Sequence, residues 1–146
     1  MKTENTVWVK FPSKSSNEAF ARTVASVFAS QLDPTMEELG DIKTSVSEAV
    51  TNCIVHAYPE TLGDITMRMK VLPDNLLEIV VKDTGCGIPD VAQARQPMFS
   101  TGGEERSGMG ITIMESFMND VRITSVQGKG TTVRMRKRII SRGDKG

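Results

Sequence analysis

The sequence predicts a two-layer α/β sandwich, in which three helices cover one face of a mostly antiparallel sheet. Two observations favour this fold class. About five strand-like runs occur, and four of them form two adjacent pairs joined by short turns, as in antiparallel hairpins. Helices and strands do not alternate regularly along the chain, so a parallel sheet built from strand–helix–strand units is not expected.

The first strand and the first helix are predicted near the N-terminus. In residues 6–11, "TVWVKF", apolar and polar residues alternate, which indicates a half-buried strand. Ser15 stands three residues before Glu18, a spacing typical of a capping box that opens a helix. This helix is expected to end near Gln31. Its expected apolar face consists of Phe20, Val24, Val27 and Phe28.

A second, longer helix is predicted from "LDPT" onward. Asp33 suits the N-cap and Pro34 suits the first helical turn, and the helix is expected to run to about Tyr58, before Pro59. Its apolar residues form a broad stripe that would pack on the sheet: Leu39, Ile42, Val46, Ala49, Val50, Cys53 and Ile54.

Two hairpins and a third helix complete the predicted fold. The strand-like runs 64–72 and 76–83 are joined by "PDN", a compact turn signal. The third helix is expected over residues 109–120. The final hairpin pairs residues 121–126 with residues 131–139.

A single domain over residues 1–146 is expected, because a chain of 146 residues supports one core and is short for two. Residues 96–107 are polar, rich in glycine and without a sustained period, which predicts a mobile lid. A basic tail is expected from about residue 137 to residue 146.

Composition excludes some function classes. Lysine plus arginine equals aspartate plus glutamate at 18 each, which argues against a general nucleic-acid or anionic-membrane binder but not against a local basic patch. No apolar run approaches the roughly 18 residues that span a bilayer, and no signal-peptide core is present, so a cytoplasmic protein is expected. Cys53 and Cys86 are predicted to be free thiols, because no metal-ligand pattern surrounds them.

Polar residues along the second helix are the first candidate site. Glu48, Asn52 and His56 are spaced four apart and therefore share one helix face. A solvated polar stripe is the plainer interpretation of that spacing. The functional interpretation is a Mg²⁺ site, since an amide oxygen and a nearby carboxylate are hard oxygen ligands. The lone histidine makes zinc unlikely and suits a hydrogen-bonding role.

The stretch "EIVVKDTGCGIPD" is the second candidate. Asp83 ends a strand, where its carboxylate is able to accept a hydrogen bond from an exocyclic amine such as that of adenine. Gly85 and Gly87 would let a flat ring lie close to the backbone. A tight turn capped by Asp83 is the alternative.

The third candidate is "RSGMGI", where Gly108 and Gly110 stand at the start of the third helix. Backbone amides at a glycine-flanked helix N-terminus favour phosphate. The stretch is neither a Walker A loop nor a dinucleotide fingerprint, because the required residues and the strand–helix–strand context are absent.

The order "EAVTNCIVHA", "DTGCGI", "SGMG" and "GKGTT" resembles the ATPase domain family shared by gyrase, Hsp90, histidine kinases and MutL, over about residues 40–133. The resemblance implies the Bergerat-type ATPase fold, with ATP or ADP and Mg²⁺ as cofactors. It implies that Asn52 holds the metal and that a loop phenylalanine corresponds to Phe99. The nucleotide-binding residues that it implies are Asn52, Asp83, Gly85, Gly87, Thr101, Gly108, Gly110 and Thr131.

Within that family, "QLDPTMEEL", "IKTSVSEAVTN", "ARQPMF" and "RSGMGITIMESFM" resemble the sporulation anti-sigma F factors over nearly the whole chain. The anti-sigma B stress kinases resemble this chain less closely. In the predicted lid, "STGGEE" departs from family members that often carry a lysine and a proline there.

This second resemblance implies an anti-sigma factor that sequesters a sporulation sigma factor. It also implies an ATP-dependent serine kinase that phosphorylates an anti-sigma factor antagonist, with a homodimer expected. Glu48 would act as the general base, Arg106 would reach the γ-phosphate, and Arg22 would contact the sigma factor. Two alternatives remain open. One is a detached histidine-kinase ATPase domain, and the other is a binding module that uses the nucleotide only as a switch.

Overall fold

The computed structural model describes residues 3–58, 61–85, 109–126 and 128–140. Helices and strands follow one another along the chain as β1 (Asn5–Pro12), α1 (Ser16–Ala29), η1 (Ser30–Leu32), α2 (Met36–Asn52), η2 (Cys53–Ala57), β2 (Asp64–Leu72), β3 (Leu76–Asp83), α4 (Met109–Phe117), β4 (Asp120–Val126) and β5 (Gly130–Arg138). The short segment η1 is a 3₁₀ helix, and η2 is a π-helical turn.

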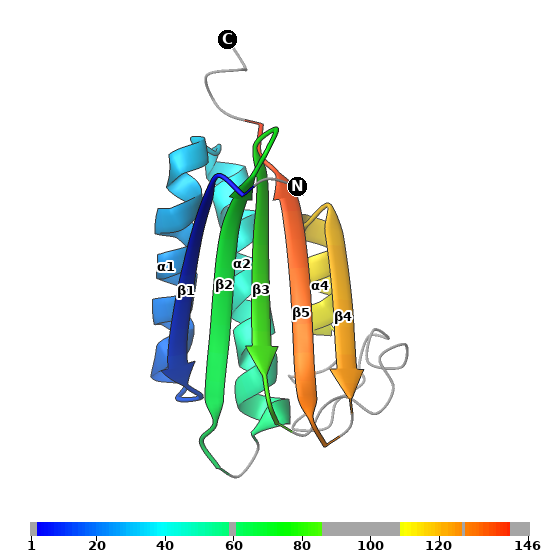
Figure 1. Ribbon diagram of the computed structural model, residues 1–146. Coiled ribbons are helices and arrows are strands. Elements are labelled where there is room, and N and C mark those ends of the chain that lie inside the picture. The colour runs from blue at the N-terminus through cyan, green and yellow to red at the C-terminus, as the bar shows by residue number, and fades with distance from the viewer. Residues whose placement is uncertain (1–2, 59–60, 86–108, 127, 141–146) are drawn as a thin grey trace.

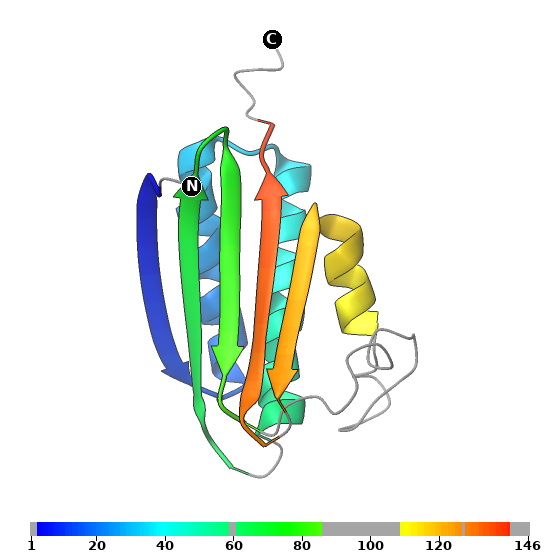
Figure 2. The same ribbon diagram turned by 45° about the vertical axis from the view of Figure 1, so that its right-hand side comes forward.

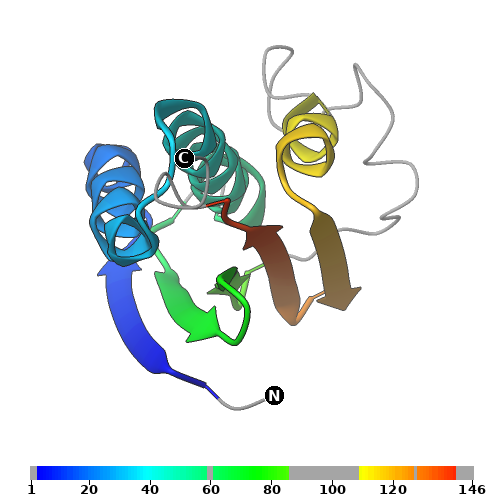
Figure 3. The same ribbon diagram turned by 90° about the horizontal axis from the view of Figure 1, so that it is seen from above.

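The five strands form one sheet in the order β1-β2-β3-β5-β4, and every neighbouring pair is antiparallel. The helices α1, α2 and α4 lie on one face of this sheet (Figures 1 and 3). Figure 3 shows α1 beside the β1 edge and α4 beside the β4 edge, with α2 between them. The predicted two-layer α/β sandwich is therefore confirmed.

The core lies between the two layers, because alternate strand residues point toward the helices. In β2 and β3 the inward side chains include Met67, Met69, Ile79 and Val81, all fully or almost fully buried. Burying one such side chain contributes about 1.5–3 kcal/mol. Five methionines lie buried in this core: Met67, Met69, Met114, Met118 and Met135.

Helix α1 confirms the predicted apolar face only in part, since Phe28 is buried and Val24 packs against the core but Phe20 and Val27 are not buried. Its buried residues are Ala21, Ala25, Phe28 and Ala29, whereas Phe20 is 49% exposed and Val27 is 68% exposed. The alanine stripe also has helical spacing, and its small side chains let the helix approach closely. Phe20 instead contacts Phe11 edge-on, with ring centroids 6.3 Å apart.

The predicted caps of both long helices are wrong. The Ser15 side chain makes no capping hydrogen bond to α1, so no capping box forms there. In α2 the N-cap is Thr35, not Asp33. The Thr35 hydroxyl accepts from the Glu38 N–H at 3.1 Å, and the Glu38 carboxylate accepts from the Thr35 N–H at 2.9 Å. Asp33 adopts a left-handed backbone conformation with φ of 51°, which lies outside the helix.

The later elements differ from expectation only at their ends. Helix α4 begins at Met109 as predicted but stops at Phe117, and β4 already begins at Asp120. Strand β5 continues to Arg138, and Ile139 is buried. Lys137 pairs with Asp41 of α2 at 3.4 Å. The first residues of the expected tail are thus packed against the domain.

The sheet face away from the helices is basic, although the chain has no net charge. One row across all five strands consists of Trp8, Arg68, Val80, Arg134 and Arg122. The basic residues on this face are Lys10, Arg68, Lys70, Lys82, Arg122, Arg134, Arg136 and Arg138, and the acidic ones are Asp64, Glu78 and Asp120. Charge is therefore segregated onto the open face.

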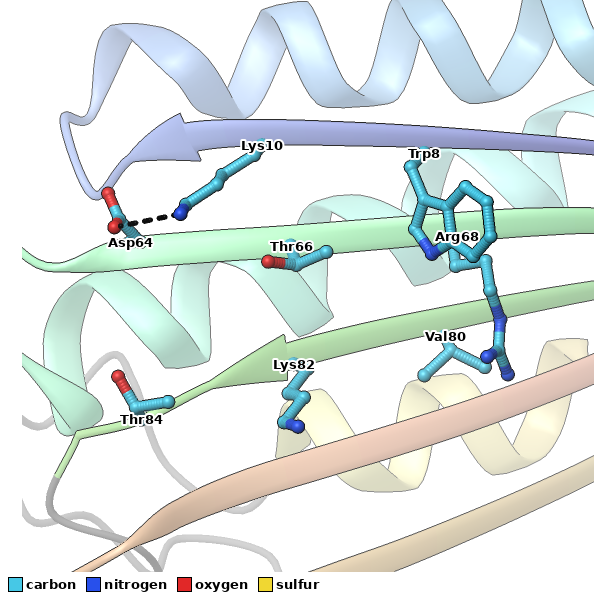
Figure 4. Close-up of a pocket in the computed structure, with 8 residues that line it drawn as sticks. All are labelled: Trp8, Lys10, Asp64, Thr66, Arg68, Val80, Lys82 and Thr84. Carbon is cyan, nitrogen blue, oxygen red and sulfur yellow. Dashed lines mark ion pairs between the residues drawn. The ribbon is translucent and has the colours of Figure 1, made fainter.

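A hollow of about 390 Å³ lies on this open face. Figure 4 shows Val80 between Trp8, Arg68 and Lys82, with Lys10 paired to Asp64. Because the hollow lies on the side of the sheet away from the helices, it is separate from the candidate residues on α2. Within the described ranges, no helix is long and apolar enough to cross a membrane.

We predict that Thr35→Ala lowers the free energy of unfolding by about 1 kcal/mol, because the substitution removes the side-chain acceptor of the α2 capping box. Urea denaturation followed by circular dichroism measures the change. Thr35→Ser keeps the hydroxyl and should retain most of the stability. Equal stability of Thr35→Ala and the wild type would contradict the assigned cap.

Candidate nucleotide site

The candidate residues gather at one end of the sandwich. The C-terminal ends of α2 and β3 meet the N-terminal ends of α4 and β5 there, at the lower end of Figures 1 and 2. Hydrophobic packing fixes this meeting point, since Val50 of α2, Val81 of β3, Ile111 of α4 and Val133 of β5 all belong to the core. The fold therefore brings together motifs that are far apart in the sequence.

Glu48 and Asn52 face the first turn of α4. A Cβ atom added to Gly110 would lie 2.8 Å from Glu48 Oε2 and 3.5 Å from Asn52 Oδ1. Both side chains are half-buried. Glycine at residue 110 thus leaves the space that these two oxygens border, and the fold brings Gly110 to Glu48 and Asn52.

Asp83 is a buried hydrogen-bond acceptor at the end of β3, with 4% of its surface exposed. Its Oδ1 accepts from the backbone N–H of Gly85 at 3.0 Å and of Thr131 at 3.2 Å. Its Oδ2 accepts from the Cys53 thiol at 3.4 Å. The turn interpretation is correct as far as the Gly85 contact. Thr131 and Cys53, however, come from other elements and tie the carboxylate to β5 and η2.

The π-helical turn η2 packs against the chain segment that follows Asp83. The Tyr58 N–H bonds to the Cys53 carbonyl at 3.2 Å, five residues back. The turn brings the Ala57 carbonyl against Gly85, where an added Cβ would overlap that oxygen. Only glycine fits at residue 85 for this reason. π-helical turns within helices are frequent at functional sites.

Tyr58 links Thr84, the residue after Asp83, to Asp64, the first residue of β2, through hydrogen bonds of its hydroxyl group. Its hydroxyl accepts from the Thr84 N–H at 2.8 Å and donates to the Asp64 carbonyl at 2.9 Å. This role of Tyr58 was not predicted from the sequence, in which Tyr58 marked only the end of a helix. Cys53 was likewise predicted as a free thiol of the apolar stripe, without a hydrogen-bond partner at the site. Neither hydrogen bond follows from local spacing, because each joins segments about 26 to 30 residues apart.

The remaining predicted residues are placed as follows. Arg22 lies on α1, away from this end of α2, and pairs with Glu18 at 3.3 Å. The side chain of His56 lies outside the described part of the structure, as do Cys86, Gly87, Phe99, Thr101, Arg106 and Gly108 and the whole predicted lid, residues 96–107. Cys53 is a free, buried thiol, as predicted.

The donor set fits magnesium. Asn52 supplies an amide oxygen, a hard ligand, with the Glu48 carboxylate beside it, and Mg²⁺ binds few protein groups while it keeps waters or phosphate oxygens. In the described segments, no three His, Cys, Asp or Glu side chains cluster as a metal site of their own. A Mg²⁺ ion here would take other ligands from waters or from the phosphate oxygens of a nucleotide.

Comparison with known proteins identifies the family. Residues 11–137 match the model of the histidine kinase-like ATPase domain. The anti-sigma F factor of Caldanaerobacter subterraneus subsp. tengcongensis is 56% identical over 140 residues, covering 95% of this chain and 97% of that protein. The anti-sigma F factor of Geobacillus kaustophilus is 49% identical, covering 92% and 93%. The chain belongs to the anti-sigma F factor family.

Solved structures support the fold of this anti-sigma F family member. The RsbU and RsbW domains of Rv1364c from Mycobacterium tuberculosis match with a TM-score of 0.68 at 18% identity, covering 92% of this chain and 32% of that one. The mycobacterial sensor histidine kinase MprB matches with a TM-score of 0.56 at 14% identity, covering 90% and 97%. Membership of the ATPase domain family implies that ATP is the nucleotide.

The environment of the Cys53 thiol makes stability depend on pH. Burial, followed by the charge of Asp83 and the hydrogen bond to it, raises the pKa of Cys53 well above the ordinary thiol value. Below about pH 8.5 the thiol is protonated in both the folded and the unfolded chain. Above that pH only the unfolded chain releases the proton, so the free energy of unfolding falls by up to about 1.4 kcal/mol per pH unit.

We predict that the stability difference between wild type and Cys53→Ser shrinks as the pH rises from 8 to 10, because serine does not titrate there. Urea denaturation at several pH values measures it, and the comparison cancels all other titrating groups. If the two stabilities change in parallel over this range, Cys53 does not remain protonated in the folded state.

Proposed function

We propose that this anti-sigma F family member binds Mg-ATP at the end of the sandwich and transfers the γ-phosphate to a serine of an anti-sigma factor antagonist. We further propose that it sequesters a sporulation sigma factor, acting as a single domain and as a homodimer. The kinase proposal is supported by the closeness of Glu48 and Asn52 to Gly110, in the first turn of a helix whose N-terminus suits phosphate, where an added Cβ would lie 2.8 Å from Glu48 Oε2.

The adenine ring would lie against Asp83. A carboxylate offers about four acceptor directions, and the described donors Gly85, Thr131 and Cys53 occupy three of them. The remaining direction on Oδ2 suits the exocyclic amino group of adenine. Guanine presents a carbonyl at that place, so this acceptor favours ATP over GTP. Gly87, Thr101 and Gly108 would complete the nucleotide contacts.

Magnesium would be held by Asn52, and when bound it would neutralise charge on the phosphate oxygens. The residues of this chain supply positioning and proton transfer. Glu48 would accept the proton of the serine hydroxyl as the hydroxyl oxygen attacks the γ-phosphorus. Arg106 would stabilise the charge on the transferred group, and the lid near residues 96–107 would cover it.

Anti-sigma F family membership favours a serine over a histidine acceptor. The histidine-kinase alternative and the nucleotide-switched binding module are separated by one experiment. Incubation with γ-labelled ATP and the candidate antagonist should give acid-stable phosphate on serine. Acid-labile phosphate would support a histidine acceptor, and absence of transfer with intact ATP binding would support the binding module.

We predict that Glu48→Gln lowers the rate of phosphotransfer by about 10²- to 10⁴-fold, the usual contribution of a general base. ATP affinity measured by calorimetry should stay close to wild type, because the amide preserves shape and polarity. Glu37→Gln makes the same change at an exposed residue in the first turn of α2, outside the site, and serves as a matched control that should keep full activity. Near-normal transfer by Glu48→Gln would remove Glu48 from this role.

Arg22 is our proposed contact with the sigma factor. Glu18, one helical turn earlier, accepts from the Arg22 guanidinium at 3.4 Å, and 39% of the arginine side chain is exposed. An arginine held in this way is available to bind a partner carboxylate through two parallel hydrogen bonds, which lysine cannot reproduce.

We predict that Arg22→Ala weakens sigma-factor binding by on the order of 2 kcal/mol or more, as for an interface hot spot. Sigma capture with ATP or ADP present measures the effect. ATP affinity should be unchanged, and Lys43→Ala, an exposed cation on α2, is the control. Full retention of the sigma factor by Arg22→Ala would place the interface elsewhere.

A further inference from the structure

We infer that Cys53 is a positioning residue for nucleotide selection, because its thiol holds Asp83 Oδ2 so that this oxygen meets the 6-amino group of the purine. The inference rests on the proposed adenine site. It goes beyond that proposal by assigning part of the base selectivity to a side chain that does not touch the nucleotide.

The hydrogen bonds around Asp83 are unequal. Oδ1 is fixed by two backbone N–H groups, those of Gly85 and Thr131. Oδ2 is the oxygen left for a ligand, and among the described residues its donor is the Cys53 thiol at 3.4 Å. The thiol therefore limits rotation of the carboxylate at the atom that matters for recognition.

Sulfur chemistry suits this task. A thiol is a weak donor, so it orients Oδ2 without competing strongly with an amino group for the same oxygen. In this hydrogen bond the thiol is the donor and the carboxylate is the acceptor, with sulfur and Oδ2 3.4 Å apart.

The position of the thiol is set by its backbone. Cys53 is the first residue of η2 and follows Asn52 directly. It is 4% exposed and belongs to the core, so its side chain has little freedom to leave Asp83. One peptide unit thus joins the proposed magnesium ligand to the residue that orients the adenine acceptor.

The test compares ATP with purine riboside triphosphate, which lacks the 6-amino group, by calorimetry. Wild type should bind ATP more tightly than the analogue. Equal affinities would reject the adenine proposal itself, whatever Cys53 does. Cys53→Ala and Cys53→Val both lack a donor, and each should lose about five-fold in ATP affinity with no loss toward the analogue. Cys53→Ser keeps a donor and should retain the preference.

The controls separate positioning from packing. Val46→Ala, a buried truncation in the preceding helix α2, should lower the denaturation temperature without changing the preference for ATP over the analogue. Cys53→Val fills the space of the thiol, so the comparison survives if Cys53→Ala fails to fold. Equal losses toward both nucleotides, or an unchanged preference in both donor-free variants, would overturn the inference.

Discussion

The site depends on one buried carboxylate at the end of a strand. Asp83 is expensive to bury unless each oxygen finds donors, and these come from Gly85, Thr131 and Cys53. The three partners belong to the turn after β3, to β5 and to η2. Satisfying one side chain therefore fixes three chain segments relative to one another, and a change in any of them disturbs the others.

The close approach of backbone around Asp83 follows from this constraint. The Ala57 carbonyl occupies the space that a side chain at residue 85 would need, and the Asp83 carbonyl does the same at Gly130. The π-helical turn supplies the first of these approaches, because a regular α-helix would aim residues 53–57 differently. The glycines thus mark where chain packs on chain, as well as where a ligand would lie close.

Most of the fold could be predicted because strand alternation and turn residues are local signals. All five strands and both hairpins were found at nearly their observed bounds. The buried face of α1 could not be predicted in this way. Two overlapping stripes of apolar residues have helical spacing there. The alanine stripe is buried because its small side chains allow close packing, and Val27 is left exposed. The predicted N-cap of α2 was wrong for a similar reason. Asp33 and Thr35 are both good capping residues, and only their backbone conformations show that Thr35 is the N-cap.

The candidate site was predictable to the extent that its groups carry distinctive chemistry at regular spacing. Glu48 and Asn52 share a helix face, and Asp83 ends a buried strand. Their residue types and positions are therefore enough to select them as candidates from the sequence. Cys53 and Tyr58 gave no such signal. Each looks like a core or helix-end residue until the fold brings Asp83 or Thr84 against it. Residues expected to touch the nucleotide can thus be proposed from the sequence. Residues that hold them in place can be identified only from the long-range contacts of the folded chain.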